Sequence, residues 1–150
     1  MENTEAHQLD YHAIVDGIYI GTNQCCQVHF DELLKQREGI TADISLEAIR
    51  LDQPFGVDFY LWLPTEDHTA PSPHQLRLGA AAITELVAMR KKVYVHCKNG
   101  HGRAPTLVAA YLITTKGMGS EEAEVFLKAR RPSMHLWDSQ REALRAFAQR

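Results

Sequence analysis

The sequence Val93-Tyr94-Val95-His96-Cys97-Lys98-Asn99-Gly100-His101-Gly102-Arg103-Ala104-Pro105-Thr106 decides the fold of this 150-residue chain. Its first three residues are β-branched or aromatic, which predicts a buried parallel strand. Gly100 and Gly102 predict a tight loop, and residues 107–113 form an apolar stretch of helical character. Pro105 suits the first turn of a helix, and Gly117 suits the position just past its end. We therefore interpret the segment as a strand, a loop and a helix.

A strand, loop and helix of this kind can bind a phosphate group and present a nucleophile to it. The first N–H groups of a helix have no intrahelical partner, and the helix dipole favours negative charge there. Arg103 is expected to hold two phosphate oxygens, and Cys97 is expected to attack as a thiolate and form a phosphocysteine. The alternative is a buried structural cysteine with Arg103 in a surface ion pair. The expected phosphate-binding residues are Lys98, Asn99, Gly100, His101, Gly102 and Arg103.

A second loop supplies candidates for the general acid that protonates a leaving alkoxide or phenoxide. This segment, residues 63–73, follows an apolar strand and precedes a helix whose start is marked by Ser72, Pro73 and Gln75. Ligands of open α/β sheets bind outside the carboxyl ends of the strands, where this loop and the Cys97 loop both begin. Asp67 is the expected acid, with Glu66 and His68 as alternatives.

These motifs resemble those of the cysteine-dependent protein phosphatases, in particular the small atypical dual-specificity group. The resemblance extends from about Gly17 to the end of the chain. It implies that Cys97 is the nucleophile, Arg103 the phosphate clamp and Asp67 the acid that later activates water. It also implies that His96 supports the loop and that Gln140 places the attacking water, unless Gln140 is only an exposed polar residue. The matching residues are His96, Cys97, Gly100, Arg103, Asp67, Pro71, Gln75, Arg131, Pro132 and Gln140.

The sequence departs from the family pattern at Ala104, because Ser or Thr usually follows the arginine. In the family, that hydroxyl is thought to hydrogen-bond the sulfur as it leaves in the second step. A hydrogen bond to a charged group contributes about 1.5–3 kcal/mol. Its absence predicts a second step slower by roughly 10- to 100-fold. A phosphate-binding pseudo-phosphatase with slow turnover is therefore an alternative. A rhodanese-type sulfurtransferase is a more distant one, which would not need Asp67.

The sequence carries less information about the substrate. The chain shows no segment like the Tyr-containing loop that deepens the pocket of the classical tyrosine phosphatases. We therefore expect phosphotyrosine and phosphoserine or phosphothreonine in proteins or peptides. Lys98 and His101 suggest a phosphoinositide instead, because phosphoinositide phosphatases of the superfamily often carry two basic residues at these positions. Both residues are equally compatible with a solvated loop.

Composition agrees with an intracellular enzyme. Hydrophobic content of 45% and charged content of 23% are ordinary for a globular protein. A net charge of −3 gives no bulk attraction to nucleic acid, and no apolar run is long enough to span a membrane. The three cysteines, two of them adjacent at Cys25 and Cys26, make a poor disulfide framework. We expect a cytoplasmic protein with neither a cofactor nor a metal.

The rest of the chain predicts one α/β domain over residues 1–150, with a polar N-terminal extension at 1–10. A central, mostly parallel sheet of four to five strands is flanked by helices on both faces, as in the tyrosine phosphatases. Asp43 interrupts the apolar pattern of its strand, without a functional explanation from the sequence. The other expected elements are a hairpin at 14–20, strands at 40–46 and 57–63, and helices at 30–37, 72–89, 121–130 (capped by Ser120) and 138–149.

Overall fold

The computed structural model describes residues 9–24 and 26–149. In these residues a single five-stranded sheet has the order β1-β2-β5-β3-β4. The β1–β2 pair is an antiparallel hairpin, and every other pairing is parallel, so the expected mostly parallel sheet is confirmed. The strands are β1 (Tyr11–Val15), β2 (Ile18–Gly21), β3 (Ile40–Ser45), β4 (Phe59–Trp62) and β5 (Lys92–His96).

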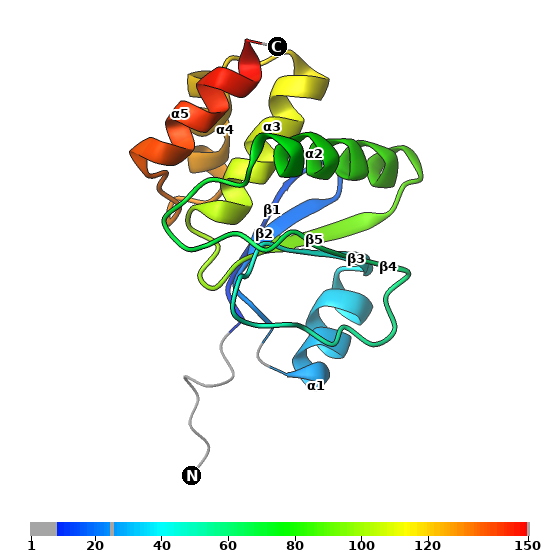
Figure 1. Ribbon diagram of the computed structural model, residues 1–150. Helices are drawn as coiled ribbons and strands as arrows, with labels where there is room; N and C mark the ends of the chain where they lie inside the picture. Colours follow the sequence, from blue (N-terminus) through cyan, green and yellow to red (C-terminus); the bar gives the residue numbers. More distant parts are fainter. Residues whose placement is uncertain (1–8, 25, 150) are drawn as a thin grey trace.

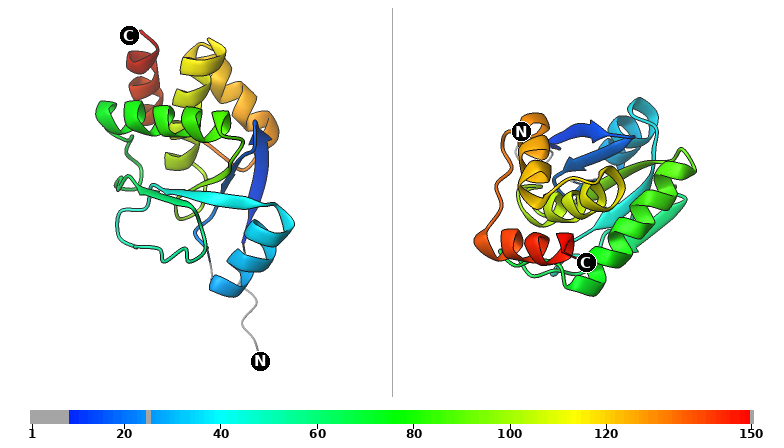
Figure 2. Two further views of the ribbon diagram at one scale, coloured as in Figure 1. Left: turned by 90° about the vertical axis from the view of Figure 1, so that its right-hand side faces the viewer. Right: turned by 90° about the horizontal axis from the view of Figure 1, so that it is seen from above.

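Helices cover both faces of the sheet, as expected (Figure 1 and Figure 2). One face carries α2 (Pro73–Ala88), α3 (Arg103–Lys116), α4 (Ser120–Arg130) and α5 (Asp138–Ala148). The other face carries α1 (Gln27–His29) and the π-helix η2 (Phe30–Arg37), whose buried Phe30 and Leu34 pack on the sheet. The larger core therefore lies between the sheet and α2–α5, with α3 at its centre.

Local signals in the sequence explain where the helices begin and end. The Ser72 side chain accepts a hydrogen bond from the N–H of Gln75, and Gln75 returns one to the N–H of Ser72, so the expected capping box starts α2. Gly117 ends α3 in the left-handed conformation, with φ at 67°. The expected cap at Ser120 is wrong, because Gly119 precedes the first turn of α4 and Ser120 is already helical.

The expected polar extension at residues 1–10 and the residue Cys25 fall almost entirely outside the described part of the chain. Cys26 is half-buried just before α1. Within the described residues, no helix has both the length and the apolar character needed to cross a bilayer.

Candidate active site

The loop between β5 and α3 forms one wall of a small cavity of about 70 Å³. The cavity brings together the three residues expected to do the chemistry, Cys97, Arg103 and Asp67. Among the described residues, Lys98, Gly100 and Glu66 are not part of its lining, although each was a candidate. The lining residues are Asp67, His68, Cys97, Asn99, His101, Gly102, Arg103, His135 and Trp137.

The curled shape of the loop depends on Gly100 and on the fully buried Arg131. Gly100 has a φ of 68°, and a Cβ there would lie 2.6 Å from the carbonyl oxygen of Gly21. Arg131 donates from Nε to the carbonyl of Gly100 at 2.8 Å and from Nη2 to the carbonyl of Asn99 at 2.9 Å. With these carbonyls turned toward Arg131, the loop N–H groups are free to face a bound anion.

Contacts on the N-terminal hairpin hold Arg131 in turn. Its Nη1 lies 2.7 Å from Nδ1 of His12, and its Nη2 lies 3.2 Å from the carboxylate of Asp10. Arg131, one of the residues that match the phosphatase family, is therefore a buried brace between the N-terminal hairpin and the phosphate loop.

Arg103 is the first residue of α3 and is almost fully buried, so a surface ion pair is excluded for it. Its Nη1 donates to the carbonyl of Thr65 at 2.9 Å and to Oε1 of Glu47 at 3.3 Å. Its Nε has no hydrogen-bond partner in the described part of the chain. One edge of the guanidinium is thus anchored, while Nε remains available to a phosphate oxygen.

Glu47 is a site residue that the sequence reasoning missed. It lies just after β3, at the same carboxyl edge of the sheet as Cys97, which is the signal that identifies it. Burial raises the pKa of its carboxyl group, but the hydrogen bond from Asn23 and the charge of Arg103 outweigh burial and lower it. Glu47 therefore carries the negative charge that anchors Arg103.

Asp67 projects from an exposed loop over Arg103. Its Oδ1 lies 3.5 Å from Nε of Arg103, and its side chain remains about half exposed. The start of α5 ties this loop down, because Ser139 donates to the carbonyl of His68 and Gln140 donates to the carbonyl of Thr69, both at 3.1 Å. The acid loop is thus fixed at its tip while Asp67 remains accessible.

Gln140 is fully buried, so the alternative interpretation of this residue as an exposed polar side chain is wrong. Its Oε1 accepts from the N–H of Trp137 at 2.9 Å. A Cβ on Gly102 would lie 2.9 Å from the same oxygen, which places the Gln140 amide against the end of the phosphate loop. The residue is well placed beside the site, and its function in water placement stays a prediction.

Ala104 is buried in the first turn of α3, and the nearby hydroxyl of Thr106 does not replace the missing one. Thr106 donates from Oγ1 to the carbonyl of Gly102 at 2.7 Å. Its hydroxyl hydrogen is therefore committed to the backbone and is not available to the Cys97 sulfur. The expected effect of Ala104 on the second step is unchanged by the structure.

Three aromatic rings, those of His101, His135 and Trp137, form the rim of the cavity. His135 and Trp137 were not predicted from the sequence. His101 lies 5.7 Å from His135, and His135 lies 5.6 Å from Trp137, measured between ring centroids. Burial lowers the pKa of His101, and the charge of Arg131 and the proximity of His135 lower it further. His101 is therefore neutral at pH 7.

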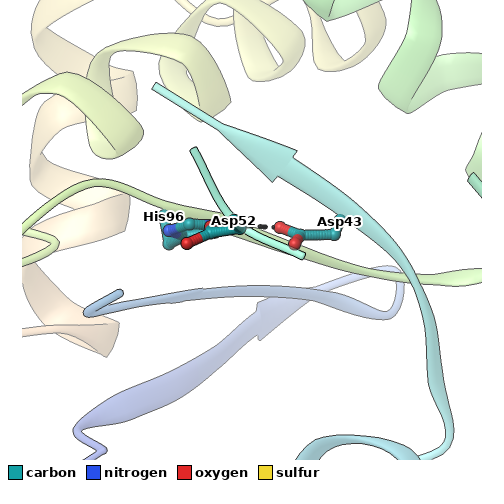
Figure 3. A group of neighbouring side chains, drawn as sticks. All are labelled: Asp43, Asp52 and His96. Carbon is teal, nitrogen blue, oxygen red and sulfur yellow. Dashed lines mark ion pairs between the residues drawn. The ribbon is translucent and has the colours of Figure 1, made fainter. Parts of the chain in front are cut away.

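His96 lies beneath the loop in a buried polar cluster that the sequence did not predict. Its Nε2 lies 2.8 Å from Oδ1 of Asp43 and 2.8 Å from Oδ2 of Asp52 (Figure 3). Its Nδ1 lies 2.8 Å from Oδ1 of Asn23. Burial lowers the pKa of His96, but the two carboxylates outweigh burial and raise it to about 10. These contacts account for the polar Asp43 inside a buried strand.

Comparison with known proteins gives a consistent result. The family model of the dual specificity phosphatase catalytic domain matches residues 18–150. Phosphatidylglycerophosphate phosphatase PTPMT2 of Arabidopsis thaliana is 37% identical over 90 residues, which are 59% of this chain and 40% of the relative. Dual specificity protein phosphatase 5 of Homo sapiens is 38% identical over 73 residues, 48% of this chain and 19% of the relative.

Solved structures extend the similarity over nearly the whole fold. The crystal structure of PTPMT1 in complex with PI(5)P has a TM-score of 0.83 and 26% identity, and the match covers 93% of this chain and 94% of that one. The curated relatives are longer proteins, of which this chain spans about half or less.

Proposed function

The chain belongs to the dual specificity phosphatase catalytic-domain family, and on this basis we propose that it hydrolyses phosphate monoesters through a phosphocysteine intermediate. One observation carries the proposal. Cys97, Arg103 and Asp67 line a single cavity at the N-terminus of α3. A nucleophile, a phosphate clamp and a proton donor are thus present where the helix dipole favours an anion.

In the first step, the sulfur of Cys97 attacks the phosphorus and the bond to the leaving oxygen breaks. The open Nε of Arg103 and the loop N–H groups bind the phosphoryl oxygens as charge develops on them. Asp67 gives its proton to the leaving oxygen, so an alcohol or a phenol departs. In the structure, the Asp67 carboxylate pairs with Nε of Arg103. A bound phosphate takes the place of this carboxylate on Arg103.

In the second step, water attacks the phosphocysteine. The Asp67 carboxylate takes a proton from the water, the sulfur–phosphorus bond breaks, and Cys97 leaves as a thiolate with release of inorganic phosphate. Because Ala104 brings no hydroxyl and Thr106 donates to Gly102, we propose that the loop N–H groups alone stabilise the departing thiolate. This step limits turnover.

Phosphotyrosine and phosphoserine or phosphothreonine in proteins are the proposed substrates. Asp67, His135 and Trp137 are all exposed at the rim, which leaves room for a peptide around the phosphorylated side chain. Relatives named as dual specificity protein phosphatases support this choice. The net charge of −3 offers no general attraction to nucleic acid.

A phosphoinositide is the second candidate, supported by relatives named for lipid phosphates. The His101 ring in the cavity lining favours such a headgroup only in acid, where the ring gains charge. The exposed Lys98 lies outside the cavity lining, so the proposed basic pair is divided between the cavity and the surface. Release of inorganic phosphate from phosphopeptides, compared with release from phosphoinositides in vesicles, distinguishes the two substrates. A cytoplasmic location remains a proposal based on the three cysteines of the sequence.

The activity is tested with two aryl phosphates that differ in leaving group, para-nitrophenyl phosphate and phenyl phosphate. Cys97→Ser is expected to abolish hydrolysis of both. Asp67→Asn is expected to lose roughly 100-fold or more on phenyl phosphate, whose leaving group needs a proton, and much less on the nitrophenyl ester. Glu66→Gln is the matched control because this neighbouring carboxylate lies outside the cavity lining, and it should stay within about twofold of the wild type.

The outcomes separate the alternatives. An inactive wild-type protein that still binds phosphate through Arg103 would indicate the pseudo-phosphatase. Activity retained in Cys97→Ser would exclude the phosphocysteine mechanism.

A further inference from the structure

We propose that Asp43, Asp52 and His96 form a binding site for a divalent transition-metal ion beneath the phosphate loop. The ligand atoms are Oδ1 of Asp43, Oδ2 of Asp52 and Nε2 of His96, which all lie within 4.8 Å of one another (Figure 3). None of the three residues lines the phosphate-binding cavity. The proposed metal site is therefore independent of the proposed phosphatase activity.

The three buried ligand atoms converge as ion pairs, but none of them makes a well-directed hydrogen bond in the described part of the chain. Nε2 lies 2.8 Å from each carboxylate oxygen, yet none of the three atoms has a hydrogen-bond partner among the described residues. Because 2.8 Å is a normal hydrogen-bonding distance, it is the angle at the Nε2 hydrogen that does not suit either carboxylate oxygen. A single N–H on Nε2 cannot serve two carboxylates in this arrangement, whereas a cation bound by all three atoms satisfies them together.

The spacing of the ligand atoms also suits a metal ion. Bonds of about 2.0–2.2 Å that meet a metal ion at right angles place neighbouring ligand atoms about 2.8–3.1 Å apart. The observed 2.8 Å between Nε2 and each oxygen fits this arrangement. Tetrahedral bonds would place the atoms about 3.3 Å apart. These two separations fit right-angled coordination better than tetrahedral coordination, and the two oxygens lie within 4.8 Å of each other. One imidazole with two carboxylates suits Mn²⁺ and its transition-metal neighbours.

Outer contacts already orient all three ligands. Asn23 donates from Nδ2 to Glu47, which turns its Oδ1 toward His96 and requires a proton on Nδ1 of the imidazole. Hydrogen bonding of the other ring nitrogen is the usual support for a metal-binding histidine. The outer oxygen of Asp43 accepts from Gln24 at 3.2 Å. The outer oxygen of Asp52 lies 3.4 Å from Nε of Arg50.

A second cavity connects the site to solvent. Asp52 and Gln24 line a second cavity of about 290 Å³ between α1 and the 50–55 segment. The ion can enter through this cavity, where water can complete its coordination. On binding, the ion replaces the proton on Nε2, which is released to solvent.

The test is a titration of the chelator-treated, full-length chain with Mn²⁺, a hard ion that does not favour the Cys97 thiolate. Electron paramagnetic resonance counts the bound ion, and spin-echo modulation detects an imidazole nitrogen bonded to it. We expect one Mn²⁺ per chain with nitrogen modulation. Asp43→Asn and Asp52→Asn should each weaken binding by at least about tenfold. Asp58→Asn, which removes an exposed carboxylate paired with Lys91, is the matched control and should bind like the wild type.

Thermal unfolding with and without Mn²⁺ provides an independent readout. The ion should raise the unfolding temperature of the wild type and of Asp58→Asn, but not that of Asp52→Asn. If Asp43→Asn does not fold, Asp52→Asn carries the test, because Asp52 lies in a loop rather than in the central sheet. Absence of stoichiometric binding at about 1 mM Mn²⁺, or binding that Asp52→Asn leaves unchanged, would overturn the proposal.

Discussion

Replacement of Arg131 by methionine tests how the phosphate loop is held in shape. Methionine keeps most of the apolar volume but removes every hydrogen bond of the guanidinium. The carbonyls of Gly100 and Asn99, now 2.8 and 2.9 Å from Arg131, then lose their partner inside the protein. An unsatisfied buried acceptor costs about 1–3 kcal/mol, which applies to the buried Gly100 carbonyl. The Asn99 carbonyl is only part-buried, so water can replace the arginine there and the expected loss is about 1–3 kcal/mol.

The free energy of unfolding in urea is the direct measurement, supported by the unfolding temperature. For a domain of this size each kcal/mol shifts the unfolding temperature by about 2–4 °C, so a mid-range loss of about 2 kcal/mol predicts a fall of about 4–8 °C. Arg145→Met removes an exposed arginine of α5 and should change stability by less than about 0.5 kcal/mol. A loss below about 1 kcal/mol in Arg131→Met would refute the argument that these carbonyls depend on the arginine.

Three further predictions concern other parts of the molecule. Ala104→Ser should speed hydrolysis of the phosphocysteine by roughly 10- to 100-fold and abolish any burst of product in stopped-flow assays; unchanged kinetics would show that the loop N–H groups suffice. His101, whose pKa is lowered, gains charge only in acid, so wild type and His101→Gln should match at pH 7.5, while at pH 5.5 the wild type should bind a polyanionic substrate about three- to fivefold better. The pKa of Asp16 is lowered by hydrogen bonds from Tyr111 and Lys116, so its stabilisation is present above the ordinary carboxyl pKa and is lost as acid protonates it. Asp16→Asn should therefore cost about 1 kcal/mol at pH 7 and progressively less below pH 4 in urea unfolding; a constant difference would contradict this.

Local chemistry made much of the fold predictable. The capping box at Ser72 and Gln75, the terminal Gly117 and the β-branched run of β5 each act within a few residues of chain, so their positions follow from the sequence. The prediction of Ser120 as the cap of α4 was wrong by one residue. Gly119 occupies the cap position, and its N–H donates to the Glu122 carboxylate at 3.3 Å. Periodicity and capping residues set the type of an element better than its first residue.

The supporting residues of the site were harder to predict, because they come from distant parts of the chain. Arg103 is anchored by Glu47, and His96 contacts Asp52, across 56 and 44 positions of sequence. Hydrophobic periodicity in the sequence does not predict contacts between side chains so far apart. Asp43 was visible only as a charge in an apolar strand, and its partner became identifiable once β3 and β5 were placed side by side with Ser45 opposite His96. A buried charge in a central strand is thus a sign that a partner must exist.

The central claim is that Cys97 carries the phosphoryl group during turnover. The most direct measurement is intact-protein and peptide mass spectrometry after acid quench of the protein during hydrolysis of para-nitrophenyl phosphate. The account predicts one added phosphoryl group on the peptide that contains Cys97, accumulating because Ala104 leaves the second step slow. The group should be absent from Cys97→Ser and should diminish in Ala104→Ser. A protein that turns over substrate with no phosphoryl group on Cys97 in the wild type would contradict the account.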